Sequence, residues 1–577
     1  MDITKIQKSL AAKALYQPQH RFNDLYRYVR HREWLETARQ DILKNSGANT
    51  PGVDGVKGRE LTETEWRIML DEVVEAVHTG SFQPLPARRV YIPKANGGLR
   101  PLGIPTIRDR VVQEVLRMLL EPIYESRFLG CSTGFRPGRS TMHAINRVQY
   151  LSGVHNYYWV IEGDIKGCFD NIPHDHLMQV LRQVIADERL LSLIWAFLKA
   201  GYEEDEQFHQ PKTGTPQGGI VSPLLANIYL HEMDKVWWER YGSLSEHYRK
   251  QRRRQGLGNV ELVRYADDFL ILTNGSKAST ETLKAEFGDM LHTLGLTLSP
   301  EKTLITHVND GFDFLGFHIQ RRPKRSDPQQ KALYVTPTEC NIQRYKDKIR
   351  DMLATTHGDV VNKIRAINRV VRGWGNYYRH VQSIRCRQKL DHWTYTALWL
   401  WLGKKHGGNL GKRKLYDRYI QTNATGNKVL GYGTAHLARM GSIPTRRFYL
   451  PKGGIHNPYL QLETADMTRS NDDPMDVDTW DGTSTQKGFA LIRQDLLLQS
   501  GPICHRCKRQ FPQHQLSAHH VKAQQDGGKD IRSNFELLCP RCHAATPSYG
   551  GKGKRYHGEP DALKGARPVR RRGKTPS

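Results

Sequence analysis

The sequence predicts a multidomain α/β protein with a separate, metal-stapled module near its C-terminus. Three observations lead to this prediction. The chain has 577 residues, which is enough for several domains of roughly 100–200 residues each. Between residues 51 and 325, short apolar runs alternate with stretches of helical spacing, a pattern typical of α/β architecture. Two Cys-x-x-Cys pairs, 504–507 and 539–542, stand close to the end.

Changes in composition along the chain indicate where the domains end. The α/β region is preceded by a basic helical extension and followed by a segment in which Arg and Lys alternate with large apolar residues at helical spacing. A Gly-rich linker region, a compact Cys/His module and a basic tail complete the chain. The predicted boundaries are 1–50, 51–325, 338–405, 406–485, 486–550 and 551–577.

The net charge points to nucleic acid as the partner. Lys and Arg number 86 against 59 Asp and Glu, which gives a net charge of +27. Such a field attracts polyanions, whereas keeping a protein in solution does not require so one-sided an excess. No run approaches the roughly 18 apolar residues that cross a membrane, and the first residues lack a secretory apolar core. We therefore expect a cytoplasmic protein that binds no membrane, with an organelle left open.

Three acidic residues follow apolar runs that are typical of buried strands. Asp164 ends a run that starts at Tyr158, and Asp267 with Asp268 forms the joint between two further apolar runs, which predicts a tight hairpin. Converging carboxylates repel one another unless a cation neutralises them, and oxygen ligands suit Mg²⁺. Two such ions about 4 Å apart can drive phosphoryl transfer. An ordinary Asx turn is the alternative for the Asp pair alone.

The order of motifs around these residues resembles that of reverse transcriptases. Tyr265-Ala266-Asp267-Asp268 is similar to the YxDD box, Asp164–Asp170 to the preceding aspartate block, and Gly214–Leu224 to the PQG block. Four more blocks agree in type and order: Ile92–Pro105, Gly134–Ser140, Leu298–Thr303 and Phe314–Phe317. The resemblance covers roughly residues 50–320. It implies an RNA-directed DNA polymerase with a right-hand fingers–palm fold around an antiparallel palm sheet.

The resemblance also implies roles for single residues. Asp164, Asp267 and Asp268 are the implied catalytic residues, and Asp164 and Asp267 would hold Mg²⁺. Phe169 would be the steric gate that selects deoxynucleoside triphosphates, although an ordinary core aromatic is the alternative. The implied nucleotide and template contacts are Lys94, Arg100, Gln217, Gly218 and Lys302.

The basic helical region resembles the maturase, or thumb, domain of group II intron proteins in the stretch Ile364–Tyr378. Three arginines at near-helical spacing fit contacts with RNA phosphates, and a merely solvated helix face is the alternative. These arginines are Arg365, Arg369 and Arg372. Trp374, Tyr377 and Tyr378 follow, and either core packing or base stacking is open for them. The implied partner is a group II intron RNA whose splicing the protein assists.

The paired cysteines near the end have the spacing of a structural zinc site. Four thiolates make a closed tetrahedral Zn²⁺ site that stabilises a small module. The predicted ligands are Cys504, Cys507, Cys539 and Cys542. The remaining cysteines are expected to be ordinary buried thiols: Cys131, Cys168, Cys340 and Cys386.

Histidines within this module resemble those of HNH nucleases, which have a ββα-metal fold. By that resemblance, His520 is the general base that activates water, and His519 and His543 bind one catalytic divalent ion, Mg²⁺ or a similar metal. Asn534 would either orient the base or complete the metal shell. The alternative is a zinc ribbon that binds DNA without cutting it.

Together these regions resemble a bacterial, mobile group II intron-encoded protein. The resemblance implies intron splicing, nicking of target double-stranded DNA by the HNH domain, and reverse transcription primed by the nick, in the cytoplasm or nucleoid. A DNA-binding role for residues 406–485 follows only from family architecture, and a homodimer is left open. The alternatives are a maturase that acts only as an RNA chaperone, and a domesticated reverse transcriptase whose zinc module only binds DNA.

Overall fold

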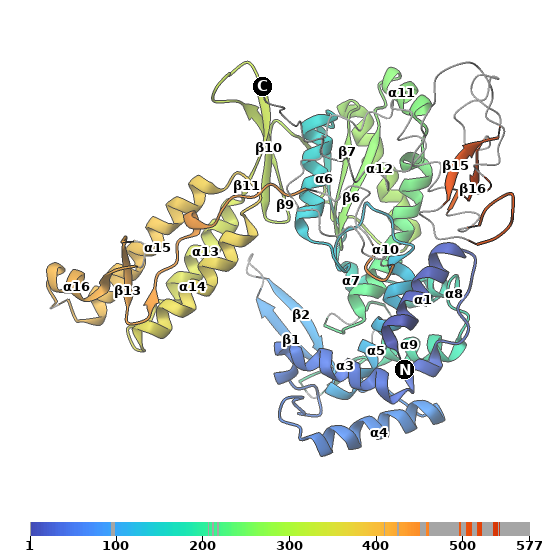
Figure 1. Cartoon of the computed structure of the whole chain (residues 1–577), viewed down its shortest axis with the longest axis horizontal. Coiled ribbons are helices and arrows are strands. Elements are labelled where there is room, and N and C mark those ends of the chain that lie inside the picture. Colours follow the sequence, from blue (N-terminus) through green and yellow to red (C-terminus); the bar gives the residue numbers. More distant parts are fainter. Residues whose placement is uncertain are drawn as a thin grey trace, which may run out of the picture. The chain divides into compact units, whose positions relative to one another are not determined.

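The computed structural model divides the chain into two compact units, Met1–Gly482 and Thr483–Ser577 (Figure 1). The structure describes residues 2–93, 98–205, 207–210, 213–215, 218–408, 410–423, 426–449, 457–460, 496–497, 503–510, 516–521, 535–539 and 542. Four predicted site residues lie outside these ranges: Lys94, Gln217, Asn534 and His543. The backbone of His520 is described, but its side chain is not.

The N-terminal region is a set of helices packed on one buried helix, α5 (Ile107–Glu125). Apolar side chains such as Leu116 and Ile123 of α5 are completely buried. Helix α4 (Glu63–Thr79) begins with a capping box between Thr62 and Glu65, which satisfies backbone N–H groups at the helix start. The N-terminal helices in contact with α5 are α1 (Ile3–Tyr16), α2 (Tyr26–Val29), α3 (Arg32–Lys44) and α4, and η1 (Ser46–Asn49) follows α3.

A four-stranded sheet of order β2-β1-β4-β5 follows these helices. Strand β1 pairs antiparallel with β2 and parallel with β4. The strands are β1 (Ala87–Pro93), β2 (Leu99–Ile104), β4 (Tyr202–Glu204) and β5 (Gln207–His209). The end of β1 and the start of β2 are exposed.

The central sheet is antiparallel throughout and has the order β6-β7-β3-β8. Successive strand residues point to opposite faces: Ile161 packs in one core cluster, whereas Val160 packs in another. The sheet is therefore buried on both faces. Its strands are β3 (Trp159–Asp164), β6 (Val260–Tyr265), β7 (Asp268–Thr273) and β8 (Leu304–His307).

Helices and one π-helical turn connect and surround this sheet (Figure 1). They are α6 (Thr141–Val154), α7 (Cys168–Asn171), α8 (His174–Arg182), α9 (Glu188–Lys199), α10 (Ser222–Trp237), η2 (Trp238–Gly242), α11 (Glu246–Arg254) and α12 (Lys277–Thr293). The mixed α/β character and the antiparallel sheets predicted from the sequence are confirmed.

After the central sheet comes a three-stranded sheet, then a helical region with its own core. The sheet has the order β11-β10-β9, from β9 (Phe312–Phe314), β10 (Phe317–Pro323) and β11 (Lys331–Pro337). The helices are α13 (Glu339–Met352), α14 (Val360–Tyr377), α15 (Ile384–Lys405) and α16 (Lys412–Tyr419). A small sheet follows, made of β12 (Ile420–Thr422), β13 (Lys428–Tyr432) and β14 (Ala435–His436), and then the turn η3 (Met440–Ser442). Ile364, Leu398 and Leu430 share the core of this region.

The chain beyond η3 returns from the helical region to α6 and α5. The Nδ2 of Asn146 on α6 donates to the carbonyl of Phe448 over 3.1 Å. The hydroxyl of Tyr459 donates to the carboxylate of Glu121 on α5 over 2.9 Å. Tyr459, more than 300 residues after α5 in the sequence, is thus hydrogen-bonded to that helix.

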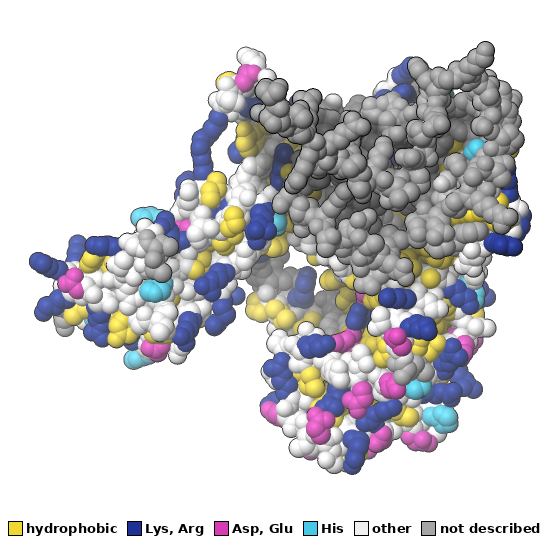
Figure 2. Space-filling view, viewed as in Figure 1, with side chains coloured by type: hydrophobic (Ala, Val, Ile, Leu, Met, Phe, Trp, Pro, Cys, Tyr) yellow, Lys and Arg dark blue, Asp and Glu magenta, His cyan; other side chains and the backbone are white. Residues whose placement is uncertain are grey.

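Lys and Arg side chains are spread over the visible, described surface, in keeping with the net charge (Figure 2). No helix in the described ranges is both long and apolar enough to cross a membrane. Cys131 and Cys168 are buried as predicted. The prediction is wrong for Cys340, which is exposed on α13, and Cys386 is only partly buried.

The second unit is described in part. Strands β15 (Ser517–His520) and β16 (Phe535–Leu538) form an antiparallel pair. Leu516 and Leu537 pack in a small core with the cysteines of the predicted zinc site. The described part of this core is small, which is consistent with a metal ion that adds to its stability.

Candidate active site and cysteine cluster

The three predicted catalytic carboxylates lie at one end of the central sheet. Asp164 ends β3 and pairs in register with Asp268, the first residue of β7. Asp268 also pairs with Tyr265 across the β6–β7 hairpin. The two-residue turn is therefore Ala266-Asp267, one position earlier than the Asp267-Asp268 joint expected from the sequence. The fold brings together residues that are about 100 positions apart.

The electrostatics of this cluster favour a bound cation. Burial raises the pKa of Asp267, and the charge of Asp164 adds to that effect. Burial, Asp267 and Asp164 raise the pKa of Asp268 to about 6, although Lys302 and Arg100 act in the opposite direction. Carboxylates that repel one another in this way are neutralised well by a divalent metal ion with oxygen ligands. The donor set therefore fits Mg²⁺.

Two cations of the predicted site act on this cluster. The Nζ of Lys302 donates to Oδ2 of Asp164 over 3.0 Å, and the Lys302 side chain is 65% exposed. Arg100 lies exposed on β2, and its charge lowers the pKa of both Asp267 and Asp268. Both cations are thus placed where they face the carboxylates.

The turn that carries Asp267 is held in an unusual backbone conformation. Ala266 has a φ of +59°, in the left-handed region that non-glycine residues adopt rarely. Residue 134 must be glycine, because a Cβ there would lie 2.2 Å from the backbone nitrogen of Ala266. The neighbouring Thr133 N–H donates to the Arg264 carbonyl over 2.9 Å. The segment that begins the Gly134–Ser140 block thus packs against the turn that carries Asp267.

A buried ion pair, which sequence reasoning missed, supports the same turn. Arg264 is fully buried, and its Nε donates to Oδ1 of Asp234 over 2.8 Å. Its Nη1 donates to the carbonyl of Ala266 over 3.0 Å and to Oδ1 of Asn227. Burial raises the pKa of Asp234, but the charge and hydrogen bonds of Arg264 lower it to about 2. An arginine within an apolar strand was the signal that could have revealed this pair.

Phe169 lies on the short helix α7, close to the carboxylates in sequence and partly buried. Its ring meets the ring of Phe135 edge to face, with the centroids 6.3 Å apart. Phe135 is 52% exposed and has a φ of +53°. The N–H of Thr215 donates to the carbonyl of Phe169 over 2.7 Å. The gate role stays a prediction, and Phe135 is a neighbour that sequence reasoning did not find.

Gly218 of the PQG block lies against the backbone of β2. Gly218 has a φ of +113°, and a Cβ there would lie 2.3 Å from the carbonyl oxygen of Gly103. The N–H of Ile220 donates to Oε1 of Gln113 on α5 over 2.7 Å. Only glycine permits this close approach. Gly218, which lies shortly before α10 in the sequence, is therefore in close contact with β2, the strand that carries Arg100.

The three maturase arginines line one exposed face of α14, as predicted. Arg365, Arg369 and Arg372 are all exposed, and Nη2 of Arg365 donates to Oγ1 of Thr434 over 3.1 Å. Their positions agree equally with RNA contact and with a solvated face.

For the aromatic residues at the end of α14, the structure favours packing over base stacking. Tyr378 is buried, and its hydroxyl donates to the carbonyl of Gly316 over 3.0 Å. Trp374 packs against Tyr378 with ring centroids 4.4 Å apart. The hydroxyl of Tyr377 donates to the carbonyl of Leu315 over 3.0 Å. These residues therefore anchor α14 to the β9–β10 turn.

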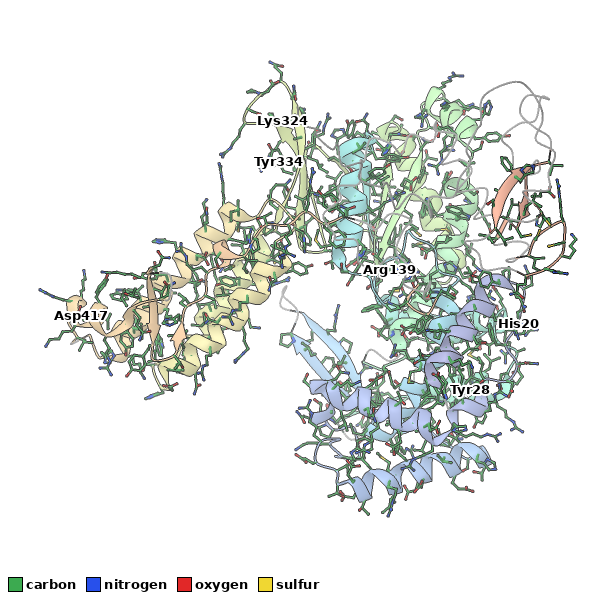
Figure 3. The ribbon with its side chains drawn as sticks, viewed as in Figure 1. His20, Tyr28, Arg139, Lys324, Tyr334 and Asp417 are labelled. Atoms are coloured by element: carbon green, nitrogen blue, oxygen red, sulfur yellow. The ribbon has the colours of Figure 1, made fainter. Side chains whose placement is uncertain are left out.

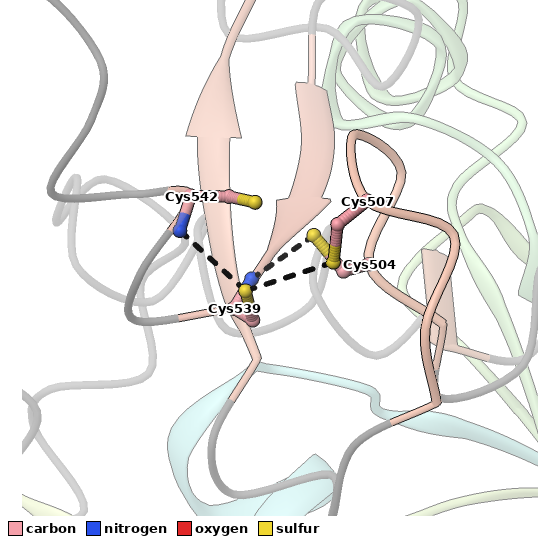
Figure 4. A group of neighbouring side chains, drawn as sticks. All are labelled: Cys504, Cys507, Cys539 and Cys542. Atoms are coloured by element: carbon pink, nitrogen blue, oxygen red, sulfur yellow. Dashed lines mark hydrogen bonds between the residues drawn. The ribbon is translucent and has the colours of Figure 1, made fainter.

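The four predicted zinc ligands converge in the second unit (Figure 4). The Sγ atoms of Cys504, Cys507, Cys539 and Cys542 all lie within 4.8 Å of one another. The Sγ atoms of Cys507 and Cys539 are 3.9 Å apart, close to the roughly 3.8 Å expected for sulfur atoms around tetrahedral zinc. Burial raises the pKa of the Cys504 thiol, but hydrogen bonds from backbone N–H groups lower it to about 6. The cluster therefore fits a metal ion that binds thiolates.

The predicted nuclease residues are only partly described. His519 and His520 lie on β15, where the backbone of His520 is opposite Phe535. Phe535 is the residue after Asn534 in the sequence. The hairpin thus brings the His-His pair next to the segment that follows Asn534. Asn534 and His543 lie outside the described residues, so their roles stay predictions.

Three family models match consecutive parts of the chain. They are described as reverse transcriptase (RNA-dependent DNA polymerase), residues 92–319; group II intron, maturase-specific domain, residues 342–420; and HNH endonuclease, residues 504–546. The chain belongs to the group II intron-encoded proteins. This family membership agrees with the order of motifs in the sequence and with the carboxylate and cysteine clusters.

Three known proteins are similar to this chain in sequence. The chain is 43% identical to protein YkfC of Escherichia coli (strain K12) over 364 residues, which are 58% of this chain and 94% of that protein. It is 36% identical to the group II intron-encoded protein LtrA of Lactococcus lactis subsp. cremoris over 383 residues, 58% of this chain and 63% of LtrA. A putative COX1/OXI3 intron 2 protein of Saccharomyces cerevisiae is 26% identical over 557 residues, 82% of this chain and 60% of that protein. The chain thus spans just under two thirds of the length of LtrA.

Proposed function

We propose that this group II intron-encoded protein copies RNA into DNA at the carboxylate end of the central sheet. One observation carries the proposal: Asp164, Asp267 and Asp268 meet there, and burial together with the neighbouring carboxylates raises the pKa values of Asp267 and Asp268. In this proposal, residues 51–325 are the fingers and palm of a right-hand polymerase, and residues 338–405 are the thumb. The N-terminal extension is residues 1–50.

Each residue of the site has a proposed task. Asp164 and Asp267 hold Mg²⁺, which when bound supplies activation of the attacking 3′-hydroxyl and charge neutralisation of the leaving oxygen. Arg100, with Lys94, binds the triphosphate of the incoming deoxynucleotide, because fixed positive charge stabilises the departing pyrophosphate. Lys302 shifts from Asp164 toward the nucleotide. The PQG loop, with Gln217 and Gly218, positions template and nucleotide.

The maturase region supplies RNA binding rather than catalytic groups. The exposed row of Arg365, Arg369 and Arg372 on α14 supports contacts with phosphates of the intron RNA. Binding would stabilise the folded intron, so that the RNA performs its own splicing chemistry. We assign residues 406–485 to target DNA binding and linkage.

The second unit, within residues 486–550, is proposed to nick one strand of the DNA target as a ββα-metal domain. The cysteine cluster, filled by Zn²⁺, fixes the β15–β16 hairpin, and His520 acts as the general base. His519 and His543 would bind a second divalent ion, and Asn534 would either orient the base or complete the shell of that ion. The nick leaves the 3′-hydroxyl from which the polymerase starts, and the whole sequence of events takes place in a bacterial cytoplasm. Residues 551–577 form a basic tail.

Primer extension on an RNA template with deoxynucleotides and Mg²⁺ tests the polymerase. We expect extension by the wild type and none by Asp267→Ala, because the variant loses a metal-binding carboxylate. Asp310→Ala, which removes an exposed carboxylate outside the site, serves as control and should extend normally. A folded, RNA-binding wild type that extends no primer would favour the chaperone function instead.

Nicking of a labelled DNA duplex tests the second unit separately. We expect His520→Ala to abolish nicking while primer extension on a supplied primer continues. Unchanged nicking by this variant would overturn the assignment of the base. No nicking by the wild type in any divalent metal would favour a module that only binds DNA.

A further inference from the structure

The β10–β11 hairpin carries a dense cluster of positive charge at its tip. Five of the eleven residues from 321 to 331 are Lys or Arg, and only Asp327 is acidic. The basic residues are Arg321, Arg322, Lys324, Arg325 and Lys331. Figure 3 shows Lys324 near the tip of the hairpin and Tyr334 part-way along its second strand.

The tip lies at the end of the central sheet opposite the carboxylates. The N–H of Arg321 donates to the carbonyl of Val308, and the N–H of Val308 donates to the carbonyl of Tyr158, each over 2.8 Å. Tyr158 precedes β3, whose far end is Asp164. Six strand residues at about 3.3 Å each separate the two ends by about 20 Å, and the hairpin continues beyond Arg321. The positive charge at the tip is therefore too distant to act on groups bound at the carboxylates.

The tip cations are also not neutralised by the protein itself. Within the part of the chain that the structure describes, none of Arg322, Lys324, Arg325 and Lys331 forms an ion pair. Lys324 donates to the neutral Oε1 of Gln330 over 2.7 Å. Exposed charges held together against their own repulsion attract a polyanion strongly.

One of these cations lies over an aromatic ring. The guanidinium of Arg322 lies 4.4 Å from the centroid of the Tyr334 ring. Arg322 is exposed, and Tyr334 is partly buried. A guanidinium plane backed by an aromatic ring is a platform on which an unpaired base can stack. Unpaired bases are common in folded RNA and rare in duplex DNA.

We propose that the tip of the β10–β11 hairpin is a second nucleic-acid-binding surface, which holds phosphates and an unpaired base of a folded RNA. This inference rests on the proposed function, in which the protein binds an intron RNA. It adds a docking point on the side of the sheet remote from polymerisation. RNA bound there stays in contact while a primer–template occupies the carboxylate end.

The test compares two charge variants of the full chain. The tip variant is Arg322→Gln/Lys324→Gln/Arg325→Gln. The matched control, Lys44→Gln/Lys57→Gln/Arg182→Gln, removes the same charge from side chains that are exposed but paired with acids. The dissociation constant is measured at several salt concentrations with two probes, a group II intron transcript folded in Mg²⁺ and a 30-base-pair DNA duplex. Tyr334→Ala and Tyr334→Phe are measured with the transcript.

We expect the tip variant to bind the transcript roughly ten- to a hundredfold more weakly and to show a salt dependence smaller by about two ion equivalents. The control should change much less, and Tyr334→Phe should retain the affinity that Tyr334→Ala loses. Equal losses in the tip variant and the control would overturn the proposal. A loss for the DNA duplex as large as that for the transcript would overturn the assignment to RNA.

Primer extension on a short RNA template separates this inference from the proposed function. The tip variant should extend a primer as fast as the wild type, since the tip is remote from Asp164. If the wild type extends no primer, the polymerase proposal fails. If all proteins extend normally and the tip variant binds the transcript normally, only the inference about the hairpin fails.

Discussion

Arg264 and Asp234 form an ion pair in which both side chains have no exposed surface. The same guanidinium donates to the carbonyl of Ala266, next to Asp267 in the catalytic turn. Removing two charges from water has an unfavourable free energy, which is offset only when the two groups form well-oriented hydrogen bonds. The pair therefore connects the position of Asp267, a proposed catalytic residue, to the packing of α10.

Removing one partner of this pair should destabilise the protein severely. We expect Arg264→Met to lower the free energy of unfolding by about 3–5 kcal/mol, because Asp234 is left buried and unpaired. The double variant Arg264→Met/Asp234→Leu should recover much of that loss, since no charge is left unpaired. Urea unfolding of the single and double variants measures the coupling. Additive losses would show that the two residues act independently.

The raised pKa of Asp268 predicts a pH-dependent stability in the absence of metal. A carboxyl with a pKa of about 6 in the folded protein and about 3.9 when unfolded stabilises the fold below pH 4, and this contribution is lost as the pH rises through 6. Asp268→Asn, which cannot ionise, should therefore gain stability over the wild type between pH 4 and 7. The neighbouring groups desolvate the Asp268 carboxyl enough to raise its pKa, but the residue is exposed at the start of β7, and solvent screening limits the gain to about 1 kcal/mol.

Thermal unfolding in a metal chelator, repeated with Mg²⁺, measures this difference. Bound Mg²⁺ stabilises the ionised wild type, so the advantage of Asp268→Asn should shrink or reverse. Asp310→Asn controls for the loss of an exposed carboxylate elsewhere. An advantage that stays constant from pH 4 to pH 8 would contradict the prediction.

Replacing Phe169 should weaken the selection of deoxynucleotides. A smaller Phe169→Val side chain leaves room for a 2′-hydroxyl, and the discrimination between deoxy- and ribonucleotides should fall by roughly 10–200-fold. Single-nucleotide incorporation with each substrate measures this ratio. Phe208→Val, at an exposed phenylalanine on β5, should leave it unchanged. Unaltered discrimination in Phe169→Val would support a purely structural role for the ring.

Loss of the cysteine cluster should affect the second unit alone. Cys504→Ser should lower the zinc content and make residues within Thr483–Ser577 sensitive to protease, because the small core of that unit depends on the metal. Primer extension should persist. Cys340→Ser removes an exposed thiol outside the cluster and should keep its zinc. Full zinc content in Cys504→Ser would exclude that thiol as a ligand.

Local patterns were sufficient to predict the main parts of the site. The apolar run before Asp164 and the two runs around Asp267 specify strands whose ends carry the carboxylates. The spacing of the cysteine pairs specified their convergence. In both cases the information lies within a few consecutive residues, and side-chain period and turn length decide the outcome.

The remaining features depend on contacts between distant segments. Residue 134 must be glycine because of its close approach to Ala266, and Arg264 on β6 pairs with Asp234 on α10. Neither contact can be predicted from the residues next to it in the sequence. The turn is Ala266-Asp267 rather than the predicted Asp267-Asp268, because Asp268 pairs with both Tyr265 and Asp164 in the sheet. Cys340 was expected to be buried, but it lies on an outward face of α13, and a thiol alone does not determine which face packs.

The return of the chain beyond η3 to α5 and α6 affects how the protein can be divided. A fragment that stops at residue 420, where the maturase match ends, lacks Phe448 and Tyr459 and so leaves Asn146 and Glu121 without these partners. The last described residue before the second unit is Leu460. A truncation intended to keep the polymerase intact should therefore extend to about that residue, beyond the maturase helices.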